Sequence, residues 1–389
     1  MAINKEQNKL NVPPLRFPEF HGEWEEHGLS EYLDFKNGLN PDSKRFGKGI
    51  KFISVMDILN NPVITYDCIR ASVQATDAEI SSFSVENGDI LFQRSSETLE
   101  DVGRANVYID DRVAVFGGFV IRGKKKANYN PLFFRYLLSS PYARKRIIPM
   151  GAGAQHFNIG QEGLSKVLLN FPSIEEQTKI ASLLHLLDER IATQSKLIED
   201  LKKLKSAISK KLLCNDKWTT CIIQDIAEIG RGRVISSVEI DRQKHPLYPV
   251  YSSQTSNNGI MGYLDNYMFD GEYITWTTDG ANAGTVFYRK GKFNCTNVCG
   301  TLKILPKFDC YFVSLVLQQA TQKYVSSNLA NPKLMNNTMA SIKIRMPNIE
   351  TQKQLSKVFQ TLDSCLLVHQ RTCKMYLSEK QYLLRQMFI

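Results

Sequence analysis

The chain has 389 residues, of which 43% are hydrophobic and 23% are charged, which is typical of a globular protein with two or three domains. Its formal net charge of +10 points to a polyanionic partner, although a basic protein without such a partner has the same charge. The longest strongly apolar run, Val113 to Ile121, is far shorter than the roughly 20 residues that cross a bilayer, which excludes a membrane-spanning helix.

Residues 1–170 predict a mixed α and β domain, including a short N-terminal extension. An entry segment, WEEHGLSEYLDFKNG, begins at Trp24 and ends at Gly38. Runs of β-branched and aromatic residues predict strands at 88–95, 104–109 and 114–121, followed by a helix at 130–147 and a polar, glycine-rich loop at 150–158.

Residues 171–215 predict one long helix. Pro172 precedes it and Ser173 is a suitable N-cap. Apolar residues recur every seven positions, as in a coiled coil, and Leu183, Leu197 and Leu204 are expected beside that seam. The predicted seam consists of Ile180, Leu187, Gln194, Leu201 and Ile208.

Residues 216–345 predict a second domain built like the first. Its entry segment, WTTCIIQDIAEIGRG, begins at Trp218 and repeats the first segment at an offset of 194 residues. Strands are predicted at 271–278, 284–289 and 300–305, a helix at 310–325, and glycine-rich or polar loops at 252–259, 277–284 and 327–337.

Residues 346–389 predict a second long helix that repeats the first at an offset of 175 residues. Pro347, Glu350 and Gln352 match Pro172, Glu175 and Gln177, and Asn348 stands at the N-cap. Its seam consists of Leu355, Leu362, His369, Tyr376 and Leu383. Because the obvious partner of each helix is its own copy, we expect them to pack antiparallel, with Gln194 facing His369 near the midpoint.

The doubled P-x-I-E-x-Q helix start, the paired Trp-to-Gly entry segments and the run from Tyr273 to Lys303 together resemble the specificity subunit of type I restriction–modification systems. The resemblance covers nearly the whole chain. It implies an α+β fold with two similar globular target-recognition domains, separated by two long antiparallel helices that form a coiled coil, in a pseudo-two-fold symmetric arrangement.

The resemblance also implies a function and partners. The chain would be a non-catalytic subunit that reads a bipartite, asymmetric site on double-stranded DNA. Its eight cysteines, which are scattered without paired spacing, separately predict free thiols and a cytoplasmic location. It would assemble with two methyltransferase subunits and with restriction and translocase subunits. It would itself bind no cofactor, since S-adenosylmethionine, ATP and magnesium are expected on the partners.

Base-reading residues are expected among Arg, Gln, Asn, Ser and Thr side chains in loops flanked by glycine, because these groups reach the groove edges of DNA. Arg94 and Arg104 are the strongest candidates, since arginine can form two hydrogen bonds with guanine. The full set is Arg94, Ser95, Arg104, Gln155, His156 and Asn158 in the first domain, and Gln254, Thr255, Thr277, Asp279, Asn282 and Lys333 in the second.

Clusters of basic residues are expected to contact DNA phosphates, although any one cluster is also consistent with a solvated face. These candidates are Lys124, Lys125, Lys126, Arg144, Lys145, Arg231, Arg233, Arg289 and Lys292.

Enzymatic alternatives find little support in the sequence. Asn130 to Phe133, NPLF, lacks the second proline of an adenine methyltransferase motif and fits a helix start capped by Asn130. No nucleotide-binding loop is present, and Cys295 and Cys299 are too far apart for a C-x-x-C metal motif. The remaining alternative is a non-catalytic coiled-coil assembly scaffold whose basic charge is incidental.

Overall fold

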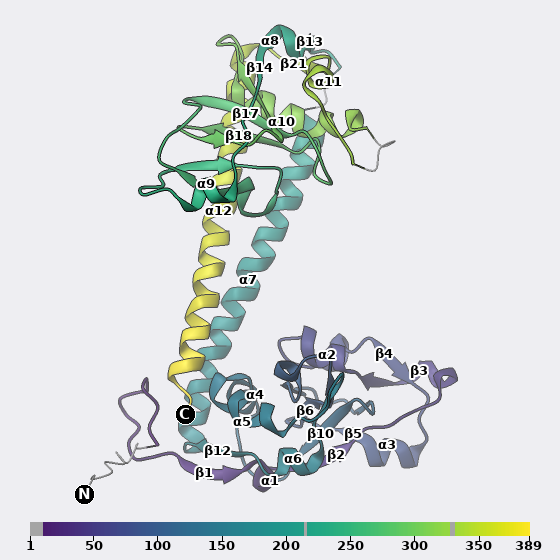
Figure 1. Cartoon of the computed structure of the whole chain (residues 1–389). Helices are drawn as coiled ribbons and strands as arrows, with labels where there is room; N and C mark the ends of the chain where they lie inside the picture. The colour runs from purple at the N-terminus through teal and green to yellow at the C-terminus, as the bar shows by residue number, and fades with distance from the viewer. Residues whose placement is uncertain (1–10, 214–215, 327–330) are drawn as a thin grey trace, which may run out of the picture. The chain divides into compact units, whose positions relative to one another are not determined.

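A computed structural model describes residues 11–213, 216–326 and 331–389 (Figure 1). By its contacts the chain divides into two compact units: residues up to Ser195 together with Arg371–Ile389, and Lys196–Gln370. The two long helices, α7 (Ile174–Leu212) and α12 (Ile349–Gln386), fall inside the predicted helical spans. Each unit therefore contains one globular domain and part of both long helices.

The entry and exit strands of each domain lie side by side. In the first domain β1 (Glu25–Gly28) pairs antiparallel with β12 (Leu168–Phe171). In the second, β13 (Thr219–Ile222) pairs in the same way with β21 (Lys343–Met346). Because each exit strand leads directly into a long helix, the repeated segments of the sequence form one structural frame.

Each domain has a four-stranded antiparallel core sheet with the same strand order. The first is β2-β10-β6-β8 and the second is β14-β20-β17-β18. The register also agrees, since Asn37 faces Ile121 in the first sheet and its counterpart Arg231 faces Gly300 in the second. The strands are β2 (Leu33–Asn37), β6 (Ile90–Gln93), β8 (Ala105–Val107), β10 (Val120–Lys125), β14 (Ala227–Arg231), β17 (Glu272–Thr277), β18 (Val286–Lys290) and β20 (Cys299–Ile304).

The domains differ in a second, smaller sheet. In the first domain it has four strands in the order β4-β3-β9-β5, whereas in the second it has three in the order β16-β15-β19. Its strands are β3 (Phe46–Ile53), β4 (Ala71–Val73), β5 (Ser84–Val85) and β9 (Ala114–Phe116) in the first domain, and β15 (Tyr248–Tyr251), β16 (Ile260–Leu264) and β19 (Asn294–Cys295) in the second. The same regions of the chain contain the helices α2 (Val55–Asn60), α3 (Asp77–Phe83) and α9 (Ser237–Asp241).

The remaining elements are short, apart from the helices that pack on the core sheets. These are α1 (Leu29–Tyr32), β7 (Ser95–Ser96), α4 (Pro131–Ser139), α5 (Pro141–Ile147), β11 (Phe157–Asn158), α6 (Gln161–Ser165), α8 (Ile223–Ile226), α10 (Cys310–Ala320) and α11 (Asn336–Ala340). The prediction of a helix beginning after Asn130 is confirmed, because the Asn130 side chain accepts a hydrogen bond of 3.0 Å from the Phe133 amide.

The glycines that end the two entry segments have the same structural cause. A Cβ atom on Gly38 would lie 2.1 Å from the carbonyl oxygen of Gly117, and one on Gly232 would lie 2.1 Å from that of Cys295. Each glycine therefore lets two backbones approach more closely than any side chain allows.

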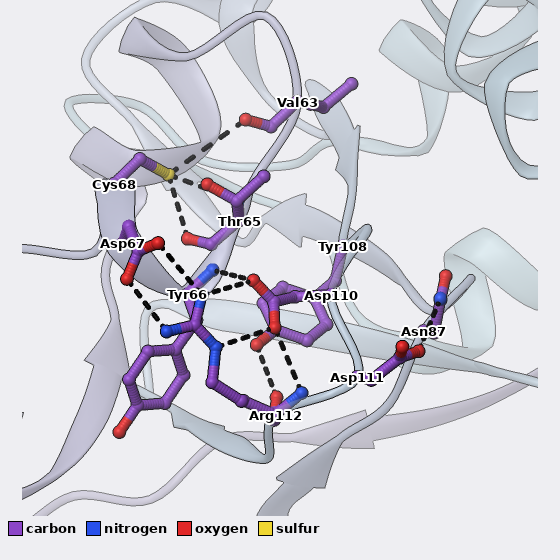
Figure 2. A network of polar contacts seen from close by, with 10 residues as sticks. All are labelled: Val63, Thr65, Tyr66, Asp67, Cys68, Asn87, Tyr108, Asp110, Asp111 and Arg112. Atoms are coloured by element: carbon purple, nitrogen blue, oxygen red, sulfur yellow. Dashed lines mark hydrogen bonds and ion pairs between the residues drawn. The ribbon is translucent and has the colours of Figure 1, made fainter.

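A polar network in the first domain joins the segment Tyr66–Cys68 to the loop that follows β8 (Figure 2). The Arg112 guanidinium donates to both carboxylate oxygens of Asp67, each at 2.9 Å, and to Asp110 at 2.9 and 3.0 Å. It also lies over the Tyr66 ring, 4.5 Å from its centroid. Arg112 holds the pKa of both carboxyl groups below their ordinary values.

The glutamine of the repeated helix start joins each long helix to its domain. Gln177 donates to the carbonyl oxygen of Pro172 at 3.0 Å and accepts from the Asn130 amide at 3.1 Å. Gln352 makes the equivalent contacts with Pro347 at 2.8 Å and with the Asp309 amide at 2.9 Å. Both glutamine side chains are buried, and each one donates to and accepts from the backbone, which explains why the motif is repeated.

The long helices run antiparallel within each unit. In the first unit Lys380 pairs with Asp188, and Ser195 lies 3.7 Å from Cys373. In the second unit Lys205 pairs with Asp363, which is the same ion pair displaced by 175 residues. The predicted seam residues Ile180 and Leu187 are buried, and both belong to the core cluster of the first unit, which also contains Leu383.

Of the three residues expected beside the seam, Leu183 is partly buried against the first core, but the other two were predicted wrongly. Leu197 and Leu204 are exposed, and the more buried row is Leu184, Ile191 and Ile198. These residues lie four positions after each seam residue rather than three. Gln194 and His369 belong to different units, so their contact stays a prediction.

The end of each long helix contributes to a domain core. In the first unit the Trp24 ring lies edge-on to Phe133 and Phe388, with centroids 6.1 and 6.4 Å away. In the second unit Leu213 is buried in the core cluster, where Trp218 packs against Phe312 at 5.8 Å. Phe388 follows Leu213 by the same 175 residues as the other helix positions.

Candidate nucleic-acid interface

Polar and glycine-rich loops gather at one end of each core sheet, and we call this end the loop edge. In the first domain the Arg94 amide donates to the carbonyl of Phe119 and the Ile159 amide to that of Arg94, both at 2.9 Å. In the second domain the Thr278 amide donates to Val298 and the Leu334 amide to Thr278, also at 2.9 Å. The two loop edges thus have the same backbone connections.

The first loop edge brings together most of the residues predicted for base reading. Ser95 faces Asn158 across the short β7–β11 pair, and the Ser95 hydroxyl donates to the Asn158 side chain. Arg94 is half-buried and donates to the carbonyl of Gly118 at 3.2 Å. Gln155 and His156 are exposed on the adjoining loop. These five residues therefore form one surface.

The second loop edge gathers five of its six predicted residues. Asp279 faces Lys333, whose ammonium lies 3.6 Å from the Asp279 carboxylate. Asn282 donates to the carbonyl of Ser253, next to Gln254 and Thr255, at 3.4 Å. The sixth prediction was wrong: Thr277 is only 1% exposed, because it points into the domain from the last position of β17.

Comparisons with known proteins agree with this arrangement. The model of the type I restriction modification DNA specificity domain matches twice, at residues 21–203 and 215–374. The chain belongs to this family. It is therefore a specificity subunit, which is a non-catalytic component of a type I system, and it acts in DNA sequence recognition.

Relatives and solved structures support the same assignment. The Mycoplasma pneumoniae protein named "Putative type I specificity subunit S.MpnORF201P" is 37% identical over 198 residues, which are 50% of this chain and 82% of that protein. The specificity subunit of the type I restriction enzyme MpnII, from the same organism, is 42% identical over 145 residues, or 37% of this chain and 43% of that protein. The crystal structure of a type I S subunit from M. genitalium shares the fold with a TM-score of 0.69 at 17% identity, covering 97% of this chain and 99% of that one.

The specificity subunit also has a cavity beside its first loop edge. The cavity has a volume of about 390 Å³ and is lined by Arg104, Arg135 and Arg144 together with Glu100. Arg104, which was predicted to read bases, pairs with Asp101 at 2.6 Å and lines this cavity. Burial, assisted by the Arg104 charge, lowers the pKa of Arg144 to about 10. Arg144 donates to the carbonyls of Glu100 and Val102, so it stabilises the loop that contains these two residues.

The predicted phosphate contacts divide between the two ends of the sheets. Arg231 and Arg233 are exposed at the second loop edge. Arg231 is the last residue of β14, and the backbone of Arg233 forms an isolated β-bridge with Thr296. Lys124 and Lys125 end β10 at the opposite end of the first sheet, where they face Asp34 and Leu33. The exposed Lys126 follows them, so this cluster does not join the loop edge.

Three other phosphate candidates lie elsewhere. Arg289 was predicted wrongly, because it is only 3% exposed and its guanidinium lies over the Tyr251 ring at 3.5 Å. Burial lowers the pKa of Arg289 to about 10. Lys292 is exposed but packs over Tyr267, 4.4 Å from the ring centroid, and Lys145 is exposed on α5.

Cysteine and metal chemistry add no site in the part of the chain that the structure describes. Cys295 and Cys299 are both buried, and burial raises the pKa of the Cys299 thiol to about 11. Within residues 11–213, 216–326 and 331–389 no cluster of His, Cys, Asp and Glu could hold a metal ion. None of the helices in these ranges is both long and apolar enough to cross a membrane.

One exposed residue of the first loop edge was not among the residues predicted from the sequence. Phe119 is 69% exposed and follows two glycines immediately before β10. It stands where the second domain has Val298. A bulky aromatic residue after two glycines indicates an exposed turn, but this turn lies inside the apolar run Val113 to Ile121, whose composition also fits a strand.

Proposed function

We propose that this specificity subunit reads a split, asymmetric DNA site, with one half-site for each recognition domain. One observation carries the proposal: the two core sheets agree in strand order and register, whereas their loop edges present different side chains. A duplicated frame with two different reading surfaces suits a site with two different halves.

We infer that two methyltransferase subunits assemble on the chain, followed by restriction and translocase subunits. The repeated helix start supports this inference, because Gln177 and Gln352 give each unit an equivalent junction of domain and helix. Equivalent junctions offer two identical partners equivalent surfaces. S-adenosylmethionine, ATP and magnesium would be bound by those partners. A similar chain with a TM-score of 0.53 comes from a structure titled for complex assembly of a type I system.

The test is a map of methylated adenines in cells that carry the chain with its methyltransferase partner. We expect a motif of two defined half-sites separated by unread base pairs, and no such motif when the chain is omitted. Methylation without sequence preference, with the complex assembled, would favour the coiled-coil assembly scaffold instead.

A second test uses the long helices. Inserting seven residues into both α7 and α12 adds about 10 Å, or about three base pairs of duplex. We expect the unread gap to lengthen while both half-sites stay the same. A changed half-site would contradict the role of the helices as a spacer.

A further inference from the structure

Two residue pairs occupy the same position at the two loop edges. Ser95 follows Arg94, and Asn158 precedes Ile159, whose amide donates to the Arg94 carbonyl. In the second domain Asp279 follows Thr278, and Lys333 precedes Leu334, whose amide donates to Thr278. The pairs Ser95/Asn158 and Asp279/Lys333 are therefore structurally equivalent, although the sequence around them differs.

The backbone positions both pairs without help from their side chains. The same two main-chain hydrogen bonds of 2.9 Å fix the strand end in each domain. The Asp279–Lys333 contact spans 3.6 Å between side chains that are 25% and 41% exposed, and ion pairs of this kind contribute little to stability. The frame is thus common to the domains, while the chemistry of the pair is free to change.

Within the part of the chain that the structure describes, each pair keeps hydrogen-bonding groups that have no protein partner. Asn158 accepts from Ser95 and donates to the carbonyl of His156 at 3.3 Å, which leaves its amide one donor and one acceptor. Lys333 has further ammonium donors, and the Asp279 carboxylate, which accepts from Thr278 at 2.9 Å, has further acceptors.

These free groups match different base pairs in the major groove. An asparagine amide matches the N7 acceptor and N6 donor of adenine. A carboxylate accepts from the N4 amino group of cytosine, while an ammonium donates to O6 and N7 of guanine, so an Asp–Lys pair complements both bases of one G·C pair.

We propose that these equivalent pairs determine sequence specificity, with Ser95/Asn158 reading an A·T pair and Asp279/Lys333 reading a G·C pair. The proposal rests on the proposed function, since it requires each domain to read its own half-site. It makes the loop edge a reading position with a fixed backbone and an exchangeable pair of side chains.

The test exchanges the pairs in the full chain with its partners and maps the methylated motif. The double variant Asp279→Ser with Lys333→Asn should lower methylation of G·C-containing sites at one position of one half-site at least tenfold and leave the other half-site unchanged. The reciprocal Ser95→Asp with Asn158→Lys should change one position of the other half-site toward G·C.

A matched control is available on the same strand. Glu272 and Lys290 face each other across β17 and β18 and form an exposed ion pair at 3.0 Å, away from the loop edge. Exchanging their charges, with Glu272→Lys and Lys290→Glu, should leave the motif unchanged. A change equal to that of the Asp279/Lys333 variant would overturn the proposal.

The outcomes separate the two levels of inference. If the wild-type complex gives no split motif, the proposed function fails. If it gives a split motif that the folded Asp279/Lys333 variant leaves unaltered, or a half-site of the second domain without a G·C pair, only the pair assignment fails. Lys333→Arg, which keeps donors for guanine, should retain the wild-type motif where the double variant loses it.

Discussion

The two recognition domains have the same entry and exit strands, the same core sheet and the same close approach at a glycine. They differ in the smaller sheet and in nearly every side chain of the loop edge. Features that repeat are those with a steric or hydrogen-bonding reason, such as Gly38 and Gly232 or Gln177 and Gln352. The features that differ are exposed, which is where a change costs little stability and alters what the surface can bind.

The largest expected difference between the domains concerns their entry tryptophans. Trp24 is 2% exposed and contacts two aromatic rings, whereas Trp218 is only half-buried. Trp24→Ala should cost about 4 kcal/mol in the free energy of unfolding and Trp218→Ala about half as much. Urea unfolding of the two variants measures this, with Trp24→Phe as the milder control. Equal losses would contradict the more complete burial of Trp24.

The two close approaches should respond alike. Gly38→Ala and Gly232→Ala place a Cβ atom against a backbone carbonyl that cannot move aside, so each should cost about 3 kcal/mol in unfolding free energy. Gly160→Ala is the matched control, because nothing lies within 4 Å of a Cβ there. If Gly38→Ala were as stable as this control in urea unfolding, the close approach of the two backbones at Gly38 would not constrain the fold.

The repeated ion pair should be stronger in the first unit. Both aspartates accept from a tyrosine hydroxyl, Asp188 from Tyr136 at 2.9 Å and Asp363 from Tyr311 at 2.6 Å. Asp188 is only 16% exposed and also pairs with Arg135 at 3.2 Å, whereas Asp363 is 40% exposed. Asp188→Asn should cost about 2 kcal/mol, which is below the range for fully buried pairs, and Asp363→Asn at most about 1 kcal/mol. Thermal unfolding at pH 7 measures both.

The pH dependence gives an independent check of Asp188. Burial acts to raise its pKa, but Lys380, Arg135 and Tyr136 outweigh burial, and the folded pKa is lowered. The stabilisation is therefore complete above the unfolded pKa of about 4 and is lost as the pH falls through the folded value. Below pH 4 the difference in unfolding free energy between the wild type and Asp188→Asn should shrink. A difference that stays constant would show that the ion pair of Asp188 with Lys380 is not its cause.

The smallest expected effect concerns the two groups of basic residues. If the loop edge faces DNA, Arg231→Gln with Arg233→Gln should lower the salt slope of binding by about 2, because each lost phosphate contact lowers it by about 0.9. Replacing Lys124, Lys125 and Lys126 by Gln should leave the slope unchanged, because these lysines lie at the end of the first core sheet opposite the loop edge. Binding of the assembled complex over a series of salt concentrations measures both. If the lysine variant lowered the salt slope and the arginine variant did not, DNA would lie at the end of the sheet opposite the loop edge.

The sequence predicted the frame well because its repeats record contacts that every copy must make. It could not decide between three and four positions for the second row of the helix seam, since Leu197 and Leu204 are apolar although exposed. It also could not tell that Thr277 and Arg289 point inward, because a strand end looks like a loop when only its composition is known. The pairing of Ser95 with Asn158 joins residues 63 positions apart, so only the fold reveals it.

The contact of Phe388 with Trp24 and Phe133 has a consequence for synthesis of the protein. The first domain leaves the ribosome early, but the residues that complete its core follow the whole second domain. At 5–20 residues per second, the interval is roughly ten to forty seconds. During this time Trp24 lacks one aromatic neighbour, so the domain made first is the domain finished last, and a ribosome that stops early leaves an exposed apolar surface for chaperones and proteases to recognise.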